Sequence, residues 1–161
     1  MRNLKRIFTA LAFAFLCAWQ APARIGIGAQ AGINLGEPDF IFFSATVKST
    51  KSPWAFSLDA DIGSMQFALN ADDWFIHKDL AYPLSGFVFW GISGTLQIKD
   101  DFHIGTGARL GAGLSLLLFG HLEIYAQGAW NPSLGIECSD EIRLMLRPLC
   151  FPVSSGARFY F

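Results

Sequence analysis

The chain has 161 residues, enough for one domain, and 52% of them are hydrophobic while 16% are charged. The formal net charge is only −1, so the sequence lacks the basic surface that binding to nucleic acid requires. No apolar run reaches the roughly 20 residues of a membrane-spanning helix, which leaves the high apolar content to be explained in another way.

The first 23 residues have the three parts of a secretory signal peptide. Three basic residues precede an apolar run from Ile7 to Trp19, and small residues surround a cleavage site after Ala23. A lipoprotein signal with Cys17 as the acylated residue is the alternative, but Leu16 is large where such sites need a small residue. Cleavage leaves one domain, residues 24–161, with 9 basic and 13 acidic residues and a formal net charge of −4.

From Arg24 onward, apolar and polar residues alternate with a period of two, which predicts strands with one apolar face. Turn residues such as those at 37–39 and 50–53 separate the segments, and a loop is expected at Ser139–Arg147. The predicted strands number about eight and span 25–36, 41–49, 54–63, 66–77, 87–99, 102–118, 121–137 and 149–161.

The fourth segment is the least regular one. Its apolar residues move from odd to even positions between Ala71 and Trp74, so that Trp74 and Ile76 continue the apolar face. An inserted residue reverses the facing of everything that follows it, so we predict a β-bulge near Asp72 and Asp73.

An even number of strands with about ten residues each favours an all-β fold, a closed antiparallel eight-stranded transmembrane β-barrel. A periplasmic sandwich or lipocalin-like barrel would show the same alternation turned inside out. Two features favour the membrane: the polar face is rich in glycine and small residues, as a narrow lumen requires, and aromatic residues lie near the strand ends, as in interfacial girdles. These aromatic residues are Trp54, Trp74, Phe102, Trp130, Phe159 and Phe161.

Three segments carry a resemblance to a known group of proteins: Gly107-Ala-Arg-Leu-Gly-Ala-Gly-Leu114, Leu122-Glu-Ile-Tyr-Ala-Gln127 and Gly156-Ala-Arg-Phe-Tyr-Phe161. Residues 85–161 resemble the carboxy-terminal half of small outer-membrane barrel proteins of spirochaetes and related diderm bacteria. The resemblance implies the eight-stranded OmpA/OmpX/OmpW-like architecture. It also implies that Phe159, Tyr160 and Phe161 present the signal read by the barrel-assembly machinery, and it implies no catalytic residue.

The predicted facing of the strands places six charged side chains in the lumen. They would form a neutral ion-pair network that braces the barrel, because charges in so narrow a space must be paired or hydrated. A gated polar path or a small-ligand site is the alternative, whereas an open porin is not expected because side chains fill an eight-stranded lumen. The six residues are Lys48, Asp59, Asp61, Arg109, Glu123 and Arg158.

The remaining candidates for chemistry are histidines and cysteines. His77, His103 and His121 lie at predicted strand ends, so we expect interfacial or solvated side chains rather than metal ligands or catalytic bases, and no cofactor. Cys138 and Cys150 flank the last loop in an oxidising compartment and could form a disulfide, although their predicted facing is opposite.

The sequence therefore predicts a small outer-membrane barrel protein with a structural or surface-interaction role. Its expected partners are outer-membrane lipid and the assembly machinery, together with a small apolar ligand or a surface ligand whose identity stays open. An OmpW-like conduit for small hydrophobic molecules is the first alternative. A lipid-modifying enzyme ranks last, because the His-x-Ser spacing of barrel deacylases is absent.

Overall fold

The computed structural model describes residues 24–36, 40–61, 63–99, 102–138 and 142–161. The predicted signal peptide, its cleavage site after Ala23 and the alternative acylation site Cys17 lie outside the described residues. No helix within the described ranges is long and apolar enough to cross a membrane.

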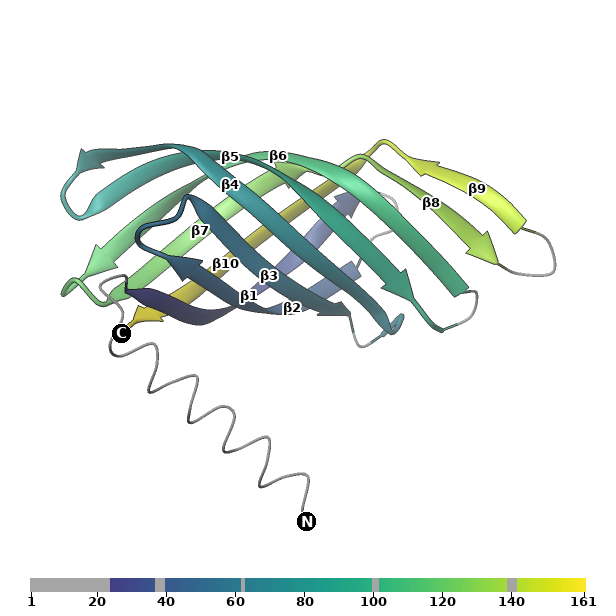
Figure 1. Cartoon of the computed structure of the whole chain (residues 1–161), viewed down its shortest axis with the longest axis horizontal. Coiled ribbons are helices and arrows are strands. Elements are labelled where there is room, and N and C mark those ends of the chain that lie inside the picture. Colours follow the sequence, from purple (N-terminus) through teal and green to yellow (C-terminus); the bar gives the residue numbers. More distant parts are fainter. Residues whose placement is uncertain (1–23, 37–39, 62, 100–101, 139–141) are drawn as a thin grey trace, which may run out of the picture.

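Ten strands form one antiparallel sheet (Figure 1). They are β1 (Ile25–Gly36), β2 (Phe40–Ser49), β3 (Trp54–Asp61), β4 (Gln66–Ala81), β5 (Leu84–Gln97), β6 (Phe102–Leu118), β7 (Leu122–Trp130), β8 (Ser133–Cys138), β9 (Ile142–Arg147) and β10 (Cys150–Tyr160).

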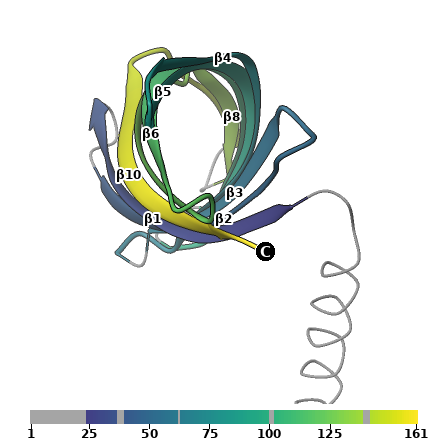
Figure 2. The ribbon, with the colours of Figure 1, turned by 90° about the vertical axis from the view of Figure 1, so that its left-hand side faces the viewer.

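The ten segments are eight strands of a closed barrel. β7 and β8 both pair with β6 and are separated only by Asn131 and Pro132; β9 and β10 are likewise separated only by Pro148 and Leu149. Proline has no amide hydrogen and interrupts the ladder at both places. β1 pairs with β10 and β5 pairs with β6, so the sheet closes on itself, as Figure 2 shows. The predicted fold class is confirmed.

The first described residue, Arg24, and the last one, Phe161, lie at the same end of the barrel, which we call the terminal end. The amide of Phe161 donates to the carbonyl oxygen of Ile25 at 3.2 Å, and the turns at 50–53, 82–83 and 119–121 lie at this end. At the opposite end, which we call the far end, the β8–β9 hairpin projects beyond the neighbouring strands (Figure 1).

The outer face is apolar along most of every barrel strand, as the alternation predicts. Ile41 and Leu69, for example, are 62% and 61% exposed, whereas the neighbours Phe42 and Asn70 are 3% and 1% exposed. An outer band of this kind suits hydrocarbon. It does not fit the sandwich or lipocalin-like alternative, whose outer face would be polar.

The structure corrects the predicted course of two segments. β4 continues to Ala81, and its bulge lies between Asp73 and Ile76, one or two residues later than predicted. The predicted loop at Ser139–Arg147 is mostly strand, because β9 pairs with β8 from Ile142 to Arg147.

Candidate functional site

Four aromatic side chains pack together inside the lumen. Trp74 on β4 stacks face to face on Phe87 of β5, with ring centroids 3.7 Å apart and an interplanar angle of 3°. Phe89 and Tyr125 complete the layer, and all four are at most 4% exposed. The four rings therefore pack against one another and against neighbouring side chains of the lumen.

Glycines on β6 make room for these rings. A Cβ atom on Gly111 would lie 2.3 Å from the Cζ atom of Phe89, and one on Gly113 would lie 2.4 Å from that of Phe87. Real carbon atoms do not approach so closely, so the inward glycines seen in the sequence are what allows Phe87 and Phe89 to cross the lumen.

Two cations lie on the aromatic layer. The ammonium group of Lys48 is 4.5 Å from the Trp74 ring centroid, and the guanidinium of Arg158 is 3.9 Å from the Tyr125 ring and 5.4 Å from Trp74. Contacts of this geometry are worth about 0.5–2 kcal/mol, with the larger values where water is excluded. We call Lys48, Trp74, Phe87, Phe89, Tyr125 and Arg158 the central plug.

A buried ion pair fixes the plug from the terminal side. The Nη1 atom of Arg158 donates to Oε2 of Glu123 at 3.1 Å, and the Tyr160 hydroxyl donates to the same oxygen at 2.7 Å. The Nε atom of Arg158 also donates to the hydroxyl of Thr46 at 3.2 Å, so the charge is paired and hydrogen-bonded on several sides.

A second ion pair lies on the far side of the plug. Arg109 donates from Nε to Oδ1 of Asp72 at 2.8 Å, and its Nη1 donates to Oδ1 of Asn70 at 3.3 Å. Asn70 in turn donates to Oδ2 of Asp59 at 2.6 Å, so an amide links the guanidinium to the second carboxylate.

The six predicted lumen charges thus divide between two clusters and one turn. Lys48, Glu123 and Arg158 belong to the first cluster, and Arg109 and Asp59 belong to the second. Asp61 joins neither, because its carboxylate accepts hydrogen bonds from Gly63 and Ser64 in the β3–β4 turn.

Sequence reasoning missed Asp72 and Trp74, and both omissions follow from the misplaced bulge. Because the bulge comes after Asp73, Asp72 and Trp74 still face inward with the even positions of β4. The prediction that Trp74 belongs to a lipid-facing girdle is therefore wrong. Two aromatic residues at inward positions of the next strand, Phe87 and Phe89, were the signal that the lumen contains an aromatic layer.

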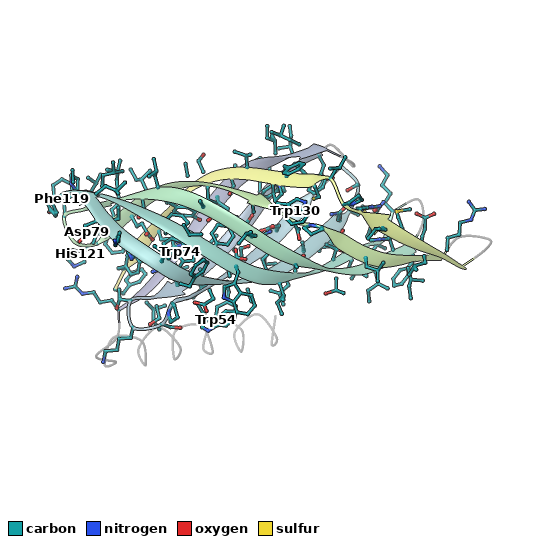
Figure 3. The ribbon with its side chains drawn as sticks, turned by 90° about the horizontal axis from the view of Figure 1, so that it is seen from above. Trp54, Trp74, Asp79, Phe119, His121 and Trp130 are labelled. Carbon is teal, nitrogen blue, oxygen red and sulfur yellow. The ribbon has the colours of Figure 1, made fainter. Side chains whose placement is uncertain are left out.

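Other predicted girdle residues do lie on the outer face. Phe102, Trp130, Phe159 and Phe161 are between 42% and 47% exposed. Trp54, labelled in Figure 3, also faces outward. On the neighbouring strands it is followed by Asp73 and then by Trp90, so that Asp73 lies between the two tryptophans. The Trp54 and Trp90 rings lie 6.1 Å apart, and Oδ1 of Asp73 is buried without a hydrogen-bond partner among the described residues.

A chamber lies on each side of the plug. The far chamber has a volume of about 40 Å³, room for a few water molecules, and Asn34, Asp59 and Arg109 are among its lining residues. The terminal chamber is larger, about 360 Å³, and its wall includes Lys48 and Glu123. The two sets of lining residues do not overlap.

The three histidines lie in different environments. His77 lines the terminal chamber, and His121 lies in the exposed β6–β7 turn near Phe119 (Figure 3). His103 is 4% exposed, so the prediction of a solvated side chain is wrong for this residue: it faces the lumen, where the absence of a side chain at Gly135 leaves space for its ring. No group of three potential metal ligands occurs among the described residues.

The possible disulfide between Cys138 and Cys150 is not formed. Cys150 carries a free thiol that donates to Oδ1 of Asn34 at 3.1 Å, while the side chain of Cys138 lies outside the described residues. The reason is the pairing of β8 with β9. Cys138 pairs with Ile142 at the start of β9, and the whole length of β9 then runs back along β8 before the chain reaches Cys150. At about 3.3 Å per residue the two backbones are roughly 20 Å apart along the strands, far beyond the reach of a disulfide.

No protein-family model matches the chain, and no curated protein matches it significantly. Among solved structures, Neisserial surface protein A superposes with a TM-score of 0.52 at 12% identity, covering 88% of this chain and 98% of that one. A major outer membrane protein from Thermus thermophilus superposes with a TM-score of 0.48 at 12% identity, over 88% of this chain and 100% of that one. With the closed strand order and the apolar outer face, the first match shows that this chain has the fold of the small eight-stranded outer-membrane β-barrels.

Proposed function

We propose that this protein is a small integral outer-membrane barrel that conducts no solute and catalyses no reaction, and that its role is structural or surface-interactive. The observation that carries the proposal is the central plug. Its aromatic rings are nearly inaccessible, and the ion pairs Arg158–Glu123 and Arg109–Asp72 hold charged side chains on both of its sides. A solute crossing the lumen would have to break stacking and charge pairing together.

The proposed partners follow from the outer surface and the termini. The apolar outer face would contact outer-membrane lipid, and Phe159-Tyr160-Phe161 would be read by the barrel-assembly machinery during insertion. A secreted chain reaches that machinery from the periplasm, so the terminal end would be periplasmic and the far end would face outward.

Surface contacts would be limited in area. The described turns at the far end, such as residues 63–65, are short, so the projecting β8–β9 hairpin would provide most of the contact surface. An interface of that size suits weak or transient binding.

An OmpW-like conduit for small hydrophobic molecules has less support. Such a molecule would need an apolar path, but charged and hydroxyl groups line the terminal chamber, and the far chamber holds only a few waters.

Conductance tests the closed lumen. The purified protein would be refolded in detergent, and its folding would be checked on a gel, where the folded barrel migrates faster before boiling than after it. The folded protein would then be added to a planar lipid bilayer, with a large porin in a parallel experiment as the positive control. We expect no discrete openings under conditions in which the porin opens. Regular single-channel steps from the refolded barrel would refute the proposal.

Cysteine labelling tests location and orientation separately. In a background with Cys138 and Cys150 replaced by serine, Ser64→Cys would report the far end and Phe119→Cys the terminal end. We expect a membrane-impermeant maleimide to label Ser64→Cys in intact cells and Phe119→Cys only after the outer membrane is permeabilised. Equal labelling of both in intact cells would contradict the proposed topology.

A further inference from the structure

The terminal chamber has features of a ligand site that a brace alone does not need. At about 360 Å³ it falls near the lower end of the roughly 300–1,000 Å³ range of small-molecule pockets. Its mouth is formed by residues of the turns at the terminal end, so a solute on that side could enter without crossing the plug. The wall residues are Arg24, Lys48, Thr50, His77, Asp79, Tyr82, Pro83, Ser85, Ser115, Leu117, Gly120, Glu123 and Tyr160.

Two hydrogen-bond donors of this wall have no acceptor among the described residues. Lys48 is 8% exposed, and no described residue accepts a hydrogen bond from its ammonium group or pairs with it within 4.0 Å; the group rests on the Trp74 ring. Ser115 is 4% exposed, and among the described residues its hydroxyl has no hydrogen-bond partner either. Lys48 lies on β2 and Ser115 on β6, so the two donors approach the chamber from different walls.

The acidic groups of the same wall already have partners. Glu123 accepts hydrogen bonds from Arg158 and Tyr160, and Asp79 accepts one from the hydroxyl of Ser85 at 2.7 Å. The chamber therefore has unused donors, whereas its carboxylates are engaged. Donors that face an open chamber without a protein acceptor are available to a bound oxygen acceptor, and a hydrogen bond from an ammonium group is charge-assisted.

The charge balance points the same way. The wall carries Arg24 and Lys48 against Asp79 and Glu123. Glu123 is also paired with Arg158, which is not a wall residue, so the group as a whole has an excess of one positive charge before His77 is counted. The guanidinium of Arg24 donates to the carbonyl oxygen of Gly120 at 2.9 Å, which holds a positive charge at the mouth. Such an arrangement attracts an anion and guides it inward.

We propose that the terminal chamber binds a small organic anion that carries one phosphate or carboxylate group. An oxygen of that group accepts a hydrogen bond from the Lys48 ammonium, and the Ser115 hydroxyl binds a second oxygen. The anion would be either a free solute of the periplasm or the headgroup of an anionic lipid. This site goes beyond the proposed structural role. It does not depend on that role, because a site on one side of the plug could bind its ligand whether or not solutes can pass the plug.

The test uses Trp74 as a reporter, because Lys48 lies directly on its ring. A variant with Trp54, Trp90 and Trp130 replaced by phenylalanine keeps Trp74 as the one tryptophan of residues 24–161. The refolded barrel in nanodiscs of zwitterionic lipid would be titrated with glycerol 3-phosphate and with lactate. Equilibrium dialysis with labelled glycerol 3-phosphate would measure binding by an independent route. A parallel sample in phosphatidylglycerol nanodiscs distinguishes a lipid headgroup from a free solute as the bound anion. If the headgroup is the ligand, it would change the emission of Trp74 before any solute is added.

We expect saturable binding with a dissociation constant below about 1 mM, weakened by added salt. Lys48→Met keeps the volume of the side chain and removes its charge, so binding should weaken at least about tenfold; Ser115→Ala should weaken it about threefold or more. Lys51→Met removes an exposed lysine of the 50–53 turn outside the chamber wall and should leave binding unchanged.

Heat-modifiable migration would show that each variant folds. Equal binding by Lys48→Met and Lys51→Met would overturn the proposed site. It would also be overturned if neither solute bound in dialysis below about 10 mM and phosphatidylglycerol left the emission of Trp74 unchanged.

Discussion

Replacing Trp74 by alanine should remove a large part of the free energy that stabilises the barrel. Trp74 is 4% exposed, and a tryptophan buries about 150–250 Å², which corresponds to about 4–6 kcal/mol at about 25 cal/mol per Å². Alanine retains a small part of that area, but the change also removes the stack on Phe87 and the contacts with Lys48 and Arg158. We therefore expect a loss of about 4 kcal/mol in the free energy of unfolding.

Urea titration of the protein refolded into lipid vesicles, followed by far-ultraviolet circular dichroism, would measure this loss without relying on tryptophan emission. Trp74→Phe keeps a ring for stacking and should cost much less. Trp130→Ala removes a half-exposed tryptophan from the outer face and serves as a second control. A cost below about 1 kcal/mol for Trp74→Ala would show that the ring does not support the lumen, and the reasoning behind the central plug would fail.

Three further changes test other parts of the molecule by the same titration. Glu123→Ala leaves the Arg158 charge buried without its partner and should lower the free energy of unfolding by about 3–5 kcal/mol. Replacing both Glu123 and Arg158 by methionine should recover most of that loss. If the single and the double replacement cost the same, the Arg158 charge is hydrated and the reasoning fails. Asp73→Asn removes a charge from the outer face and should stabilise the barrel by about 1 kcal/mol; a loss would instead show that the carboxylate has a partner in the membrane. Gly113→Val should push Phe87 off its stack and cost about 1–3 kcal/mol, with a weaker aromatic signal in near-ultraviolet circular dichroism; an unchanged signal would contradict the close packing.

The alternation of residues determined the strands and the direction in which most of them face. In β1, β2 and β6 almost every residue independently favours the same register, because a shift by one would place every apolar side chain in the lumen. Closure followed from the same pattern, since an apolar face on every strand leaves no edge that lipid would tolerate. For this reason the alternation alone was enough to assign Lys48, Arg109, Glu123 and Arg158 to the lumen.

The tertiary structure alone decided which lumen residues meet. Pairing partners depend on the stagger between strands and on the exact place of the bulge. Because the bulge in β4 comes after Asp73, both Asp72 and Trp74 face the lumen. The sequence by itself established a barrel with a polar, glycine-lined interior. The aromatic layer inside the barrel, and the donors without a protein acceptor on one side of it, come from strands far apart in the sequence. Their side chains meet across the lumen, and no local pattern records that contact.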